Sequence, residues 1–239
     1  MKRSPIKAGI TGLLIFIAAV FIAKSIVYFI PHPVIWLQQV LLKAVLILLS
    51  LLAIKYILRI SLTDAGFRKP VVKLKKAKVI FSGMGLGALA TILIFFTPAK
   101  GIPLVKQLNP LEFLLIVVIW SSLAEEIFIR GFVQSYLKPF EQQKIKLLET
   151  QLSVPVITSA LVFACMHLSL LFVEVDYYTV VFTVITTFLL GLLAGVYREK
   201  YNSITPAIIT HMSFNVGGII AGIIIAILYK IITGELPPH

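Results

Sequence analysis

The chain alternates between long apolar stretches and short polar segments, and this pattern predicts a bundle of membrane-spanning helices. An α-helix needs about 20 consecutive apolar residues to cross the hydrocarbon core of a bilayer. Such stretches recur along the whole chain, and seven are expected, at residues 8–30, 34–60, 79–98, 110–132, 153–173, 178–197 and 204–230. The pattern therefore indicates an all-α polytopic membrane protein in which residues 1–239 form a single transmembrane domain.

The composition agrees with a membrane location and removes one alternative. Hydrophobic residues make up 59% of the chain and charged residues 13%, and the mean hydropathy is +1.01. The net charge of +12 would suggest nucleic-acid binding in a soluble protein. Here the basic segment 68–78 lacks the interleaved aromatic residues that stack on bases, and we expect it to lie on anionic lipid headgroups. The lipid bilayer is therefore an expected partner, and nucleic acid is not.

The distribution of lysine and arginine predicts how the chain is oriented in the membrane. Alternate connections are rich in these residues, beginning with Lys2, Arg3 and Lys7, whereas the connections between them contain few and include the acidic Glu174 and Asp176. The positive-inside rule then places the N-terminus in the cytoplasm and the C-terminus outside. The first stretch is interpreted as a retained signal anchor, because it is longer than the apolar part of a cleaved signal peptide. The lysine- and isoleucine-rich composition favours a prokaryotic cell membrane.

Three charged residues occur inside the fourth apolar stretch, where lipid should exclude them. An ionised side chain at mid-bilayer costs about 2.5–3.5 kcal/mol, so Glu125, Glu126 and Arg130 are expected to face a protein interior or a wet cavity. Glu126 and Arg130 are four residues apart and can pair on one helix face. Glu125 is rotated by about 100° and lacks that partner on its own helix. The group is either a structural ion-pair cluster or part of a functional site.

Two further stretches carry polar side chains that such a site could use. Phe163 and His167 lie in the fifth stretch, and His211 and Asn215 lie one helical turn apart in the seventh. Each pair alone is consistent with packing or with interhelical hydrogen bonds. Counted from the predicted cytoplasmic helix ends, however, Glu125, His167, His211 and Asn215 lie at depths of roughly 18, 21, 10 and 16 Å. Helix tilt would bring them to one level, and we expect one site built from three helices.

A carboxylate, two imidazoles and an amide at one level can hydrolyse an amide bond by activating water. Glu125 would accept a proton from water, and His167 would position that water. His211 and Asn215 would donate hydrogen bonds to the oxyanion that forms. The chain has no GxSxG serine motif, and Cys165 points about 200° away from His167 on the same helix. Neither observation favours a serine or cysteine nucleophile.

Two other interpretations stay open at this point. Glu125, His167 and His211 could be three ligands of a catalytic zinc ion with one open position, although the sequence contains no HExxH motif and Asn215 would then lack a role. Alternatively, the same cavity could bind peptides or partner proteins without catalysis, as in an immunity or regulatory membrane protein.

The polar residues also resemble a known family. Glu125-Glu126-x-x-x-Arg130-Gly131, Phe163-x-x-x-His167 and His211-x-x-x-Asn215, in this order on three apolar stretches, are similar to the three signature motifs of the CPBP family. These are the CAAX-protease and bacteriocin-processing proteins, also called ABI or Rce1-like intramembrane proteases. The resemblance covers about residues 60–220, and Asp64-x-Gly66-Phe67-Arg68 resembles a segment common before the third span.

The resemblance implies a glutamate-dependent, metal-independent intramembrane endopeptidase that needs no cofactor and whose site opens to the cytoplasmic side. Family members are usually drawn with eight spans, so the bundle is expected to have seven or eight helices. The expected substrate is a peptide or membrane protein, such as a prenylated protein or a bacteriocin or signalling precursor. The residues implied are four catalytic and three supporting ones, namely Glu125, His167, His211 and Asn215, and Glu126, Arg130 and Phe163.

Overall fold

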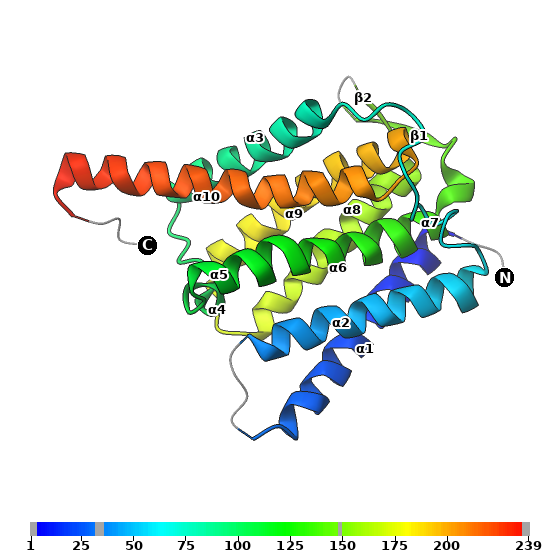
Figure 1. Ribbon diagram of the computed structural model, residues 1–239, viewed down its shortest axis with the longest axis horizontal. Helices are drawn as coiled ribbons and strands as arrows, with labels where there is room; N and C mark the ends of the chain where they lie inside the picture. The colour runs from blue at the N-terminus through cyan, green and yellow to red at the C-terminus, as the bar shows by residue number, and fades with distance from the viewer. Residues whose placement is uncertain (1–3, 32–35, 148–149, 236–239) are drawn as a thin grey trace.

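The structure is a computed structural model that describes residues 4–31, 36–147 and 150–235, and it is almost entirely helical (Figure 1). Lys2 and Arg3, on which part of the predicted orientation rests, lie outside the described residues, as do residues 34 and 35 of the second apolar stretch. Within the described part of the chain, six helices are long and apolar enough to cross a membrane. They are α1 (Pro5–Tyr28), α2 with its π-helical continuation (Leu37–Ala53 and Ile54–Leu58), α3 (Lys76–Phe95), α8 with its final 3₁₀ turns (Val154–Met166 and His167–Phe172), α9 (Tyr177–Tyr201) and α10 (Thr205–Thr233).

The fourth predicted stretch forms a continuous helical run in which α-helical and π-helical segments alternate. Its segments are α5 (Pro110–Glu112), Phe113–Ser121, α6 (Ser122–Glu126), Ile127–Val133 and α7 (Gln134–Tyr136). In Figure 1 this green run crosses the whole bundle. With it, the described residues contain seven long helical stretches, and the predicted all-α polytopic fold is confirmed. Short π-helical segments inside α-helices are frequent at functional sites, and here they flank the segment that carries both glutamates.

The connections between the helices gather at two ends of the bundle (Figure 1). One end, called the hairpin end, has residues 59–75, the 3₁₀ turn Lys138–Phe140 and the hairpin of β1 (Lys144–Leu147) with β2 (Thr150–Ser153). The two strands are antiparallel, with Lys144 opposite Ser153, and the sequence pattern did not predict them. The other end, called the α4 end, has the connections 96–109, with α4 (Pro103–Lys106), and 173–176. The orientation of these ends in a membrane stays a prediction.

Helix α10 is held against α3 by contacts between their backbones. A Cβ atom on Gly87 would collide with the carbonyl oxygen of Phe214, and one on Gly217 would collide with that of Met84. Glycine at both positions lets the helices approach closely without a hydrophobic driving force, as in other membrane bundles. This packing sets the position of the α10 segment that carries His211.

The segment before α3 is packed on the end of α9 and on the connection from α9 to α10. Gly66 has a φ of +96°, and a Cβ atom there would lie 2.6 Å from the guanidinium carbon of Arg198. Arg68 Nε donates a hydrogen bond of 3.0 Å to the carbonyl oxygen of Asn202. Only glycine combines this backbone conformation with so close a neighbour. The segment resembling the family's lead-in therefore has a structural role at the hairpin end.

Candidate active site

The four side chains proposed for catalysis line one cavity of about 950 Å³. Glu125 comes from α6, His167 from the end of α8, and His211 and Asn215 from α10. Most of the remaining wall is apolar, and it is contributed by α3, residues 102–108, the π-helical segment before α6, residues 170–175, α9 and α10. Three helices that are distant in the sequence thus bring together the residues whose depths suggested a common site.

Glu125 contacts a lysine that the sequence interpretation missed. Lys43 Nζ of α2 lies 2.5 Å from Glu125 Oε1 and donates a hydrogen bond to it. Both residues are buried, and both line the cavity. Glu125 lacks a partner on its own helix, as expected, and its partner comes from α2 instead. The signal was available, because a lysine in the middle of an apolar span is itself an indication of a functional site.

Glu126 lies in a fully enclosed network behind the cavity. Its Oε2 atom accepts a hydrogen bond of 3.0 Å from Arg130 Nε, which confirms the predicted pairing. Arg130 Nη1 also donates a hydrogen bond of 2.9 Å to Ser159 Oγ of α8. The Glu126 and Arg130 side chains are both 0% exposed. A buried pair of this kind orients the segment between them and is costly to break.

His211 connects the two glutamates. Its Nδ1 atom is 3.0 Å from Glu126 Oε1, within hydrogen-bond distance, and its Nε2 atom is 3.9 Å from Glu125 Oε2. A carboxylate accepts hydrogen bonds, so Nδ1 must carry the proton that faces Glu126. If Nε2 is also to donate to an oxyanion in the cavity, the ring must be in its doubly protonated form.

Phe163 places both imidazole rings, although it does not line the cavity itself. Its ring makes edge-to-face contacts with His167 and with His211, with centroid separations of 5.1 and 5.6 Å. His167 Nδ1 lies 2.9 Å from the carbonyl oxygen of Phe163, which directs the other ring nitrogen elsewhere. The Arg130 guanidinium lies 5.9 Å from the Phe163 ring centroid on another side. Phe163 therefore connects the enclosed network to the cavity wall.

Asn215 is oriented by a serine of α6. Its Nδ2 atom donates a hydrogen bond of 3.1 Å to Ser122 Oγ, and Ser122 is fully buried. An amide nitrogen carries two N–H groups, so one donor remains for a group in the cavity. Sequence reasoning gave no role to Ser122, which is an ordinary small residue in an apolar helix.

The cavity extends from Glu125 to the α4 end of the bundle. Its lining there includes polar side chains, Gln38, Gln107 and Glu174, from the start of α2 and the two connections at that end. The sequence predicted that the N-terminus and the mouth of the site both face the cytoplasm. In Figure 1 helix α1 begins at the hairpin end, whereas the cavity extends toward the α4 end, so the two expectations agree only if the site does not open at the α4 end.

Asp176 holds together the connections beside this mouth. It caps α9 by accepting hydrogen bonds from the backbone and the hydroxyl of Thr179, and it also accepts one of 2.9 Å from the Lys100 backbone. Partial burial raises the pKa of Asp176, but these hydrogen bonds outweigh it and lower the pKa from 3.8 to about 2. The capping carboxylate is therefore ionised at neutral pH.

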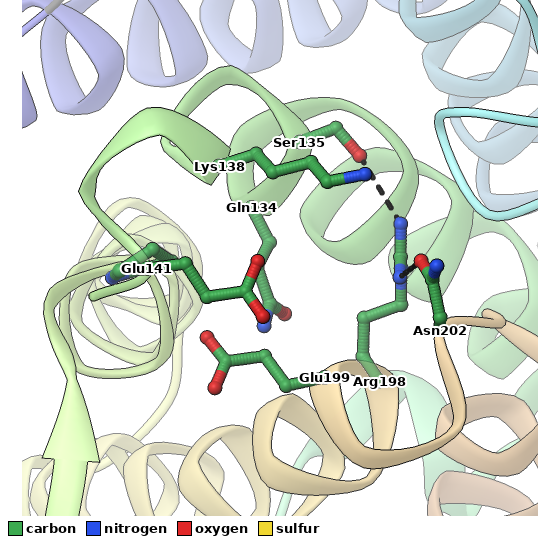
Figure 2. Close-up of a pocket in the computed structure, with 8 residues that line it drawn as sticks. Gln134, Ser135, Lys138, Glu141, Arg198, Glu199 and Asn202 are labelled. Carbon is green, nitrogen blue, oxygen red and sulfur yellow. Dashed lines mark hydrogen bonds between the residues drawn. The ribbon is translucent and has the colours of Figure 1, made fainter.

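A second, small cavity of about 110 Å³ lies at the hairpin end and contains none of the proposed catalytic residues. Figure 2 shows the carboxylates of Glu141 and Glu199 facing each other across it. Arg198 is held there by Ser135 and by Asn202, whose Oδ1 atom is 3.2 Å from its Nη1 atom. These contacts join α7 to the end of α9, and we assign them to the structure of the bundle.

The zinc interpretation is not supported by the arrangement of the side chains. Within residues 4–31, 36–147 and 150–235, no group of three or more His, Cys, Asp or Glu residues is placed to hold a metal ion. Glu125, the carboxylate of that hypothetical ligand set, is bonded to the Lys43 ammonium instead.

Comparison with known proteins agrees with the motifs. Residues 107–217 match a family described as type II CAAX prenyl endopeptidase Rce1-like. The matched segment contains all three motifs, and it confirms the resemblance to the CPBP family. Comparisons with curated proteins and with solved structures find no match. The match supports a CAAX-type intramembrane protease in general, and together with the apolar helices it supports an integral multi-pass membrane protein.

Proposed function

We propose that this Rce1-like chain is an intramembrane endopeptidase that hydrolyses a peptide bond of a membrane-associated protein or peptide. The observation that best supports this is the cavity, where a carboxylate, two imidazoles and an amide converge from three helices. Glu126, Arg130 and Phe163 lie behind that wall, where they can orient the reacting groups. This separation matches the division into catalytic and supporting residues that the resemblance implies.

In the proposed reaction, Glu125 accepts a proton from a water molecule that His167 positions. The water oxygen forms a bond to the carbonyl carbon of the peptide, and the electron pair of the C=O bond moves to oxygen. His211 Nε2 and Asn215 Nδ2 donate hydrogen bonds to this oxyanion. The electron pair of the oxyanion then re-forms the C=O bond as the C–N bond breaks, and the proton held by Glu125 passes to the leaving nitrogen. No covalent intermediate with the protein is formed.

The size and the walls of the cavity suggest what kind of substrate it takes. A volume of about 950 Å³ lies near the upper end of the roughly 300–1,000 Å³ that ligand pockets span. Most of its lining is apolar, so a peptide with apolar side chains or with a lipid modification fits it better than a highly charged one. Prenylated proteins and apolar bacteriocin or signalling precursors are all in this class.

The decisive experiment identifies the substrate and also tests whether cleavage requires a metal ion. Membrane proteomes of cells with the wild-type protein and with Glu125→Ala are compared, and one uncleaved precursor should accumulate in the variant. Glu235→Ala, at an exposed glutamate near the C-terminus, serves as the control. Purified wild-type protein should then cleave that precursor in metal-free buffer.

Two results would contradict the proposal in different ways. If the two proteomes are the same and no cleavage is found, the chain binds its partners without catalysis. If 1,10-phenanthroline abolishes cleavage and added zinc restores it, at about one metal per chain, the reaction is that of a zinc protease.

The side on which substrates enter can be measured separately. Topology reporters are fused after Lys146, at the hairpin end, and after Asp176, at the α4 end. The positive-inside rule predicts a cytoplasmic signal for the first and an external signal for the second. The part of the cavity at the α4 end would then lie toward the external side. The reverse pattern would overturn the predicted orientation and place the α4 end of the cavity toward the cytoplasm.

A further inference from the structure

Lys43 has a position that the proposed reaction, as described so far, does not use. Among the described residues that line the cavity, it is the one lysine or arginine. Its ammonium group has three N–H donors, and the structure shows one of them bonded to Glu125 Oε1. A cation thus lies directly beside the carboxylate that would take the proton from water.

Four titratable side chains lie around the Glu125 carboxylate. Lys43 faces it from α2, His211 from α10 and His167 from the end of α8, while Glu126 follows it on α6. Glu126 is neutralised by Arg130 in the enclosed network. Lys43 is therefore the cation that is hydrogen-bonded to Glu125 in the resting protein.

The proposed reaction moves the negative charge while leaving Lys43 in place. When Glu125 accepts a proton from water it becomes neutral, and Lys43 loses its counter-ion. In the same step the former carbonyl oxygen becomes an oxyanion a few ångströms away. Because the Lys43 side chain is only 11% exposed, an uncompensated ammonium there would be unfavourable, and the new anion compensates it.

We propose that Lys43 is a further catalytic residue, whose ammonium group pairs with Glu125 before the attack of water and with the oxyanion after it. This rests on the proposed peptidase function and adds a third group to the hydrogen bonds from His211 and Asn215. A flexible four-carbon stem lets the ammonium follow the charge over the short distance involved.

The second ion pair of the site shows what a purely structural pair looks like. Arg130 and Glu126 are 0% exposed, are four residues apart on one run of helix, and are bonded further to Ser159 and His211. The Lys43 and Glu125 side chains are 11% and 9% exposed, come from different helices and line the cavity. The pair at the cavity is placed to exchange partners, and the enclosed pair is not.

The test measures binding of a stable anion that imitates the oxyanion. The probe is an apolar hexapeptide in which a phosphinate replaces the central amide, and the same hexapeptide with its amide is the control ligand. Four purified full-length proteins are compared, namely wild type, Glu125→Gln, Lys43→Met and the double variant. Glutamine imitates the protonated glutamic acid, which is the state that faces the oxyanion.

We expect Glu125→Gln to bind the phosphinate at least about tenfold more tightly than the wild type, because Lys43 has lost its competitor. The double variant, which lacks the ammonium group, should not show this increase in phosphinate affinity. Affinity for the amide control should stay within about threefold in all four proteins. Equal phosphinate affinity of Glu125→Gln and the double variant would overturn the assignment of Lys43.

Turnover gives an independent measurement. Lys43→Met should lower kcat by about 10² with KM within about threefold, and Lys43→Arg should restore part of the rate. Lys55→Met, at an exposed lysine of the same helical span, should leave both constants unchanged. Wild-type kcat in Lys43→Met would also overturn the assignment.

The design separates this inference from the function on which it rests. If the wild type cleaves a precursor but Glu125→Gln does not bind the phosphinate more tightly, only the role of Lys43 is contradicted. If no precursor is cleaved at all, both the peptidase function and the role of Lys43 in it are contradicted. Lys43→Met leaves Glu125 without its counter-ion and could fail to accumulate. In that case the double variant, which has neither charge, is used in its place. Its comparison with Glu125→Gln still decides the outcome.

Discussion

Glu125 and Glu126 are neighbours on α6, yet they lie in two different kinds of environment. Glu126 is enclosed, with Arg130 bonded to one carboxylate oxygen and His211 to the other. Glu125 faces a large cavity, and its hydrogen-bonding partner in the structure is Lys43. A rotation of about 100° between consecutive helical residues is enough to separate the two environments.

The comparison shows how one short segment can combine stability and chemistry. An enclosed and fully bonded carboxylate keeps its partners, because losing one leaves a charge buried without compensation. A carboxylate at a cavity can exchange its partner for water or for substrate. We therefore expect substitutions at the first position to change turnover and substitutions at the second to change stability.

The largest effect is expected for Glu125→Gln, which keeps the shape of the side chain and removes the proton acceptor. Turnover of a confirmed substrate should fall by about 10³ or to background, since general base catalysis contributes about 10² to 10⁴. The abundance of the protein in the membrane should fall less than that of Glu126→Gln, because the Lys43 side chain lines the cavity and is 11% exposed. Activity equal to that of the wild type would end the assignment of Glu125 as the base.

Glu126→Gln should instead lower the stability of the protein. Removing one partner of a buried ion pair costs about 3–5 kcal/mol, and Arg130 would be left uncompensated. Thermal unfolding in detergent and abundance in the membrane measure the loss, with the exposed Glu235→Gln as control. The double variant Glu126→Gln with Arg130→Met should recover part of it. A single variant as stable as the wild type would show that the enclosed network is not needed for folding.

Asn215→Ala tests whether the cavity stabilises an oxyanion or only binds the substrate. Loss of one oxyanion donor lowers kcat by about 10² to 10³, and KM should change little. Ser122→Ala removes only the group that orients the amide and should have a smaller effect on the same constant. A raised KM with unchanged kcat would instead indicate a binding role.

Asp176 provides a third carboxylate, outside the bundle, for which a small effect is expected. Asp176→Ala removes the cap of α9, at a typical cost of about 1 kcal/mol. The pKa of Asp176 in the folded protein is lowered from 3.8 to about 2, so its contribution is present above about pH 4 and is lost as the pH falls toward 2. The thermal midpoints of wild type and variant should therefore differ at about pH 6 and converge with acid. A constant difference would show that the ionised carboxylate is not responsible.

Much of the fold and part of the site could be predicted because the signals are local. Seven apolar stretches correspond to six membrane-spanning helices and the run Pro110–Tyr136 in the described chain. Glu126 and Arg130 pair as expected because an interval of four residues brings side chains together on any helix. The four residues of the proposed site could be grouped because depth along a helix follows from counting residues.

Other features depend on elements that are distant in the sequence. Lys43 and Glu125 are separated by 82 residues, and no pattern on either helix indicates that the two helices touch there. The same holds for the Asn215–Ser122 hydrogen bond and for the extension of the cavity toward the α4 end. The β1–β2 hairpin was missed because four-residue strands carry little periodicity.

By itself, the sequence determined which segments enter the membrane, because the cost of transferring a side chain into lipid depends mainly on that side chain. It also determined which polar residues must avoid lipid. The tertiary structure alone decided which partners these residues have on other helices, because close packing between helices depends on the shapes of both surfaces. It placed Lys43 against Glu125, enclosed Glu126 with Arg130 and set His211 between the two glutamates.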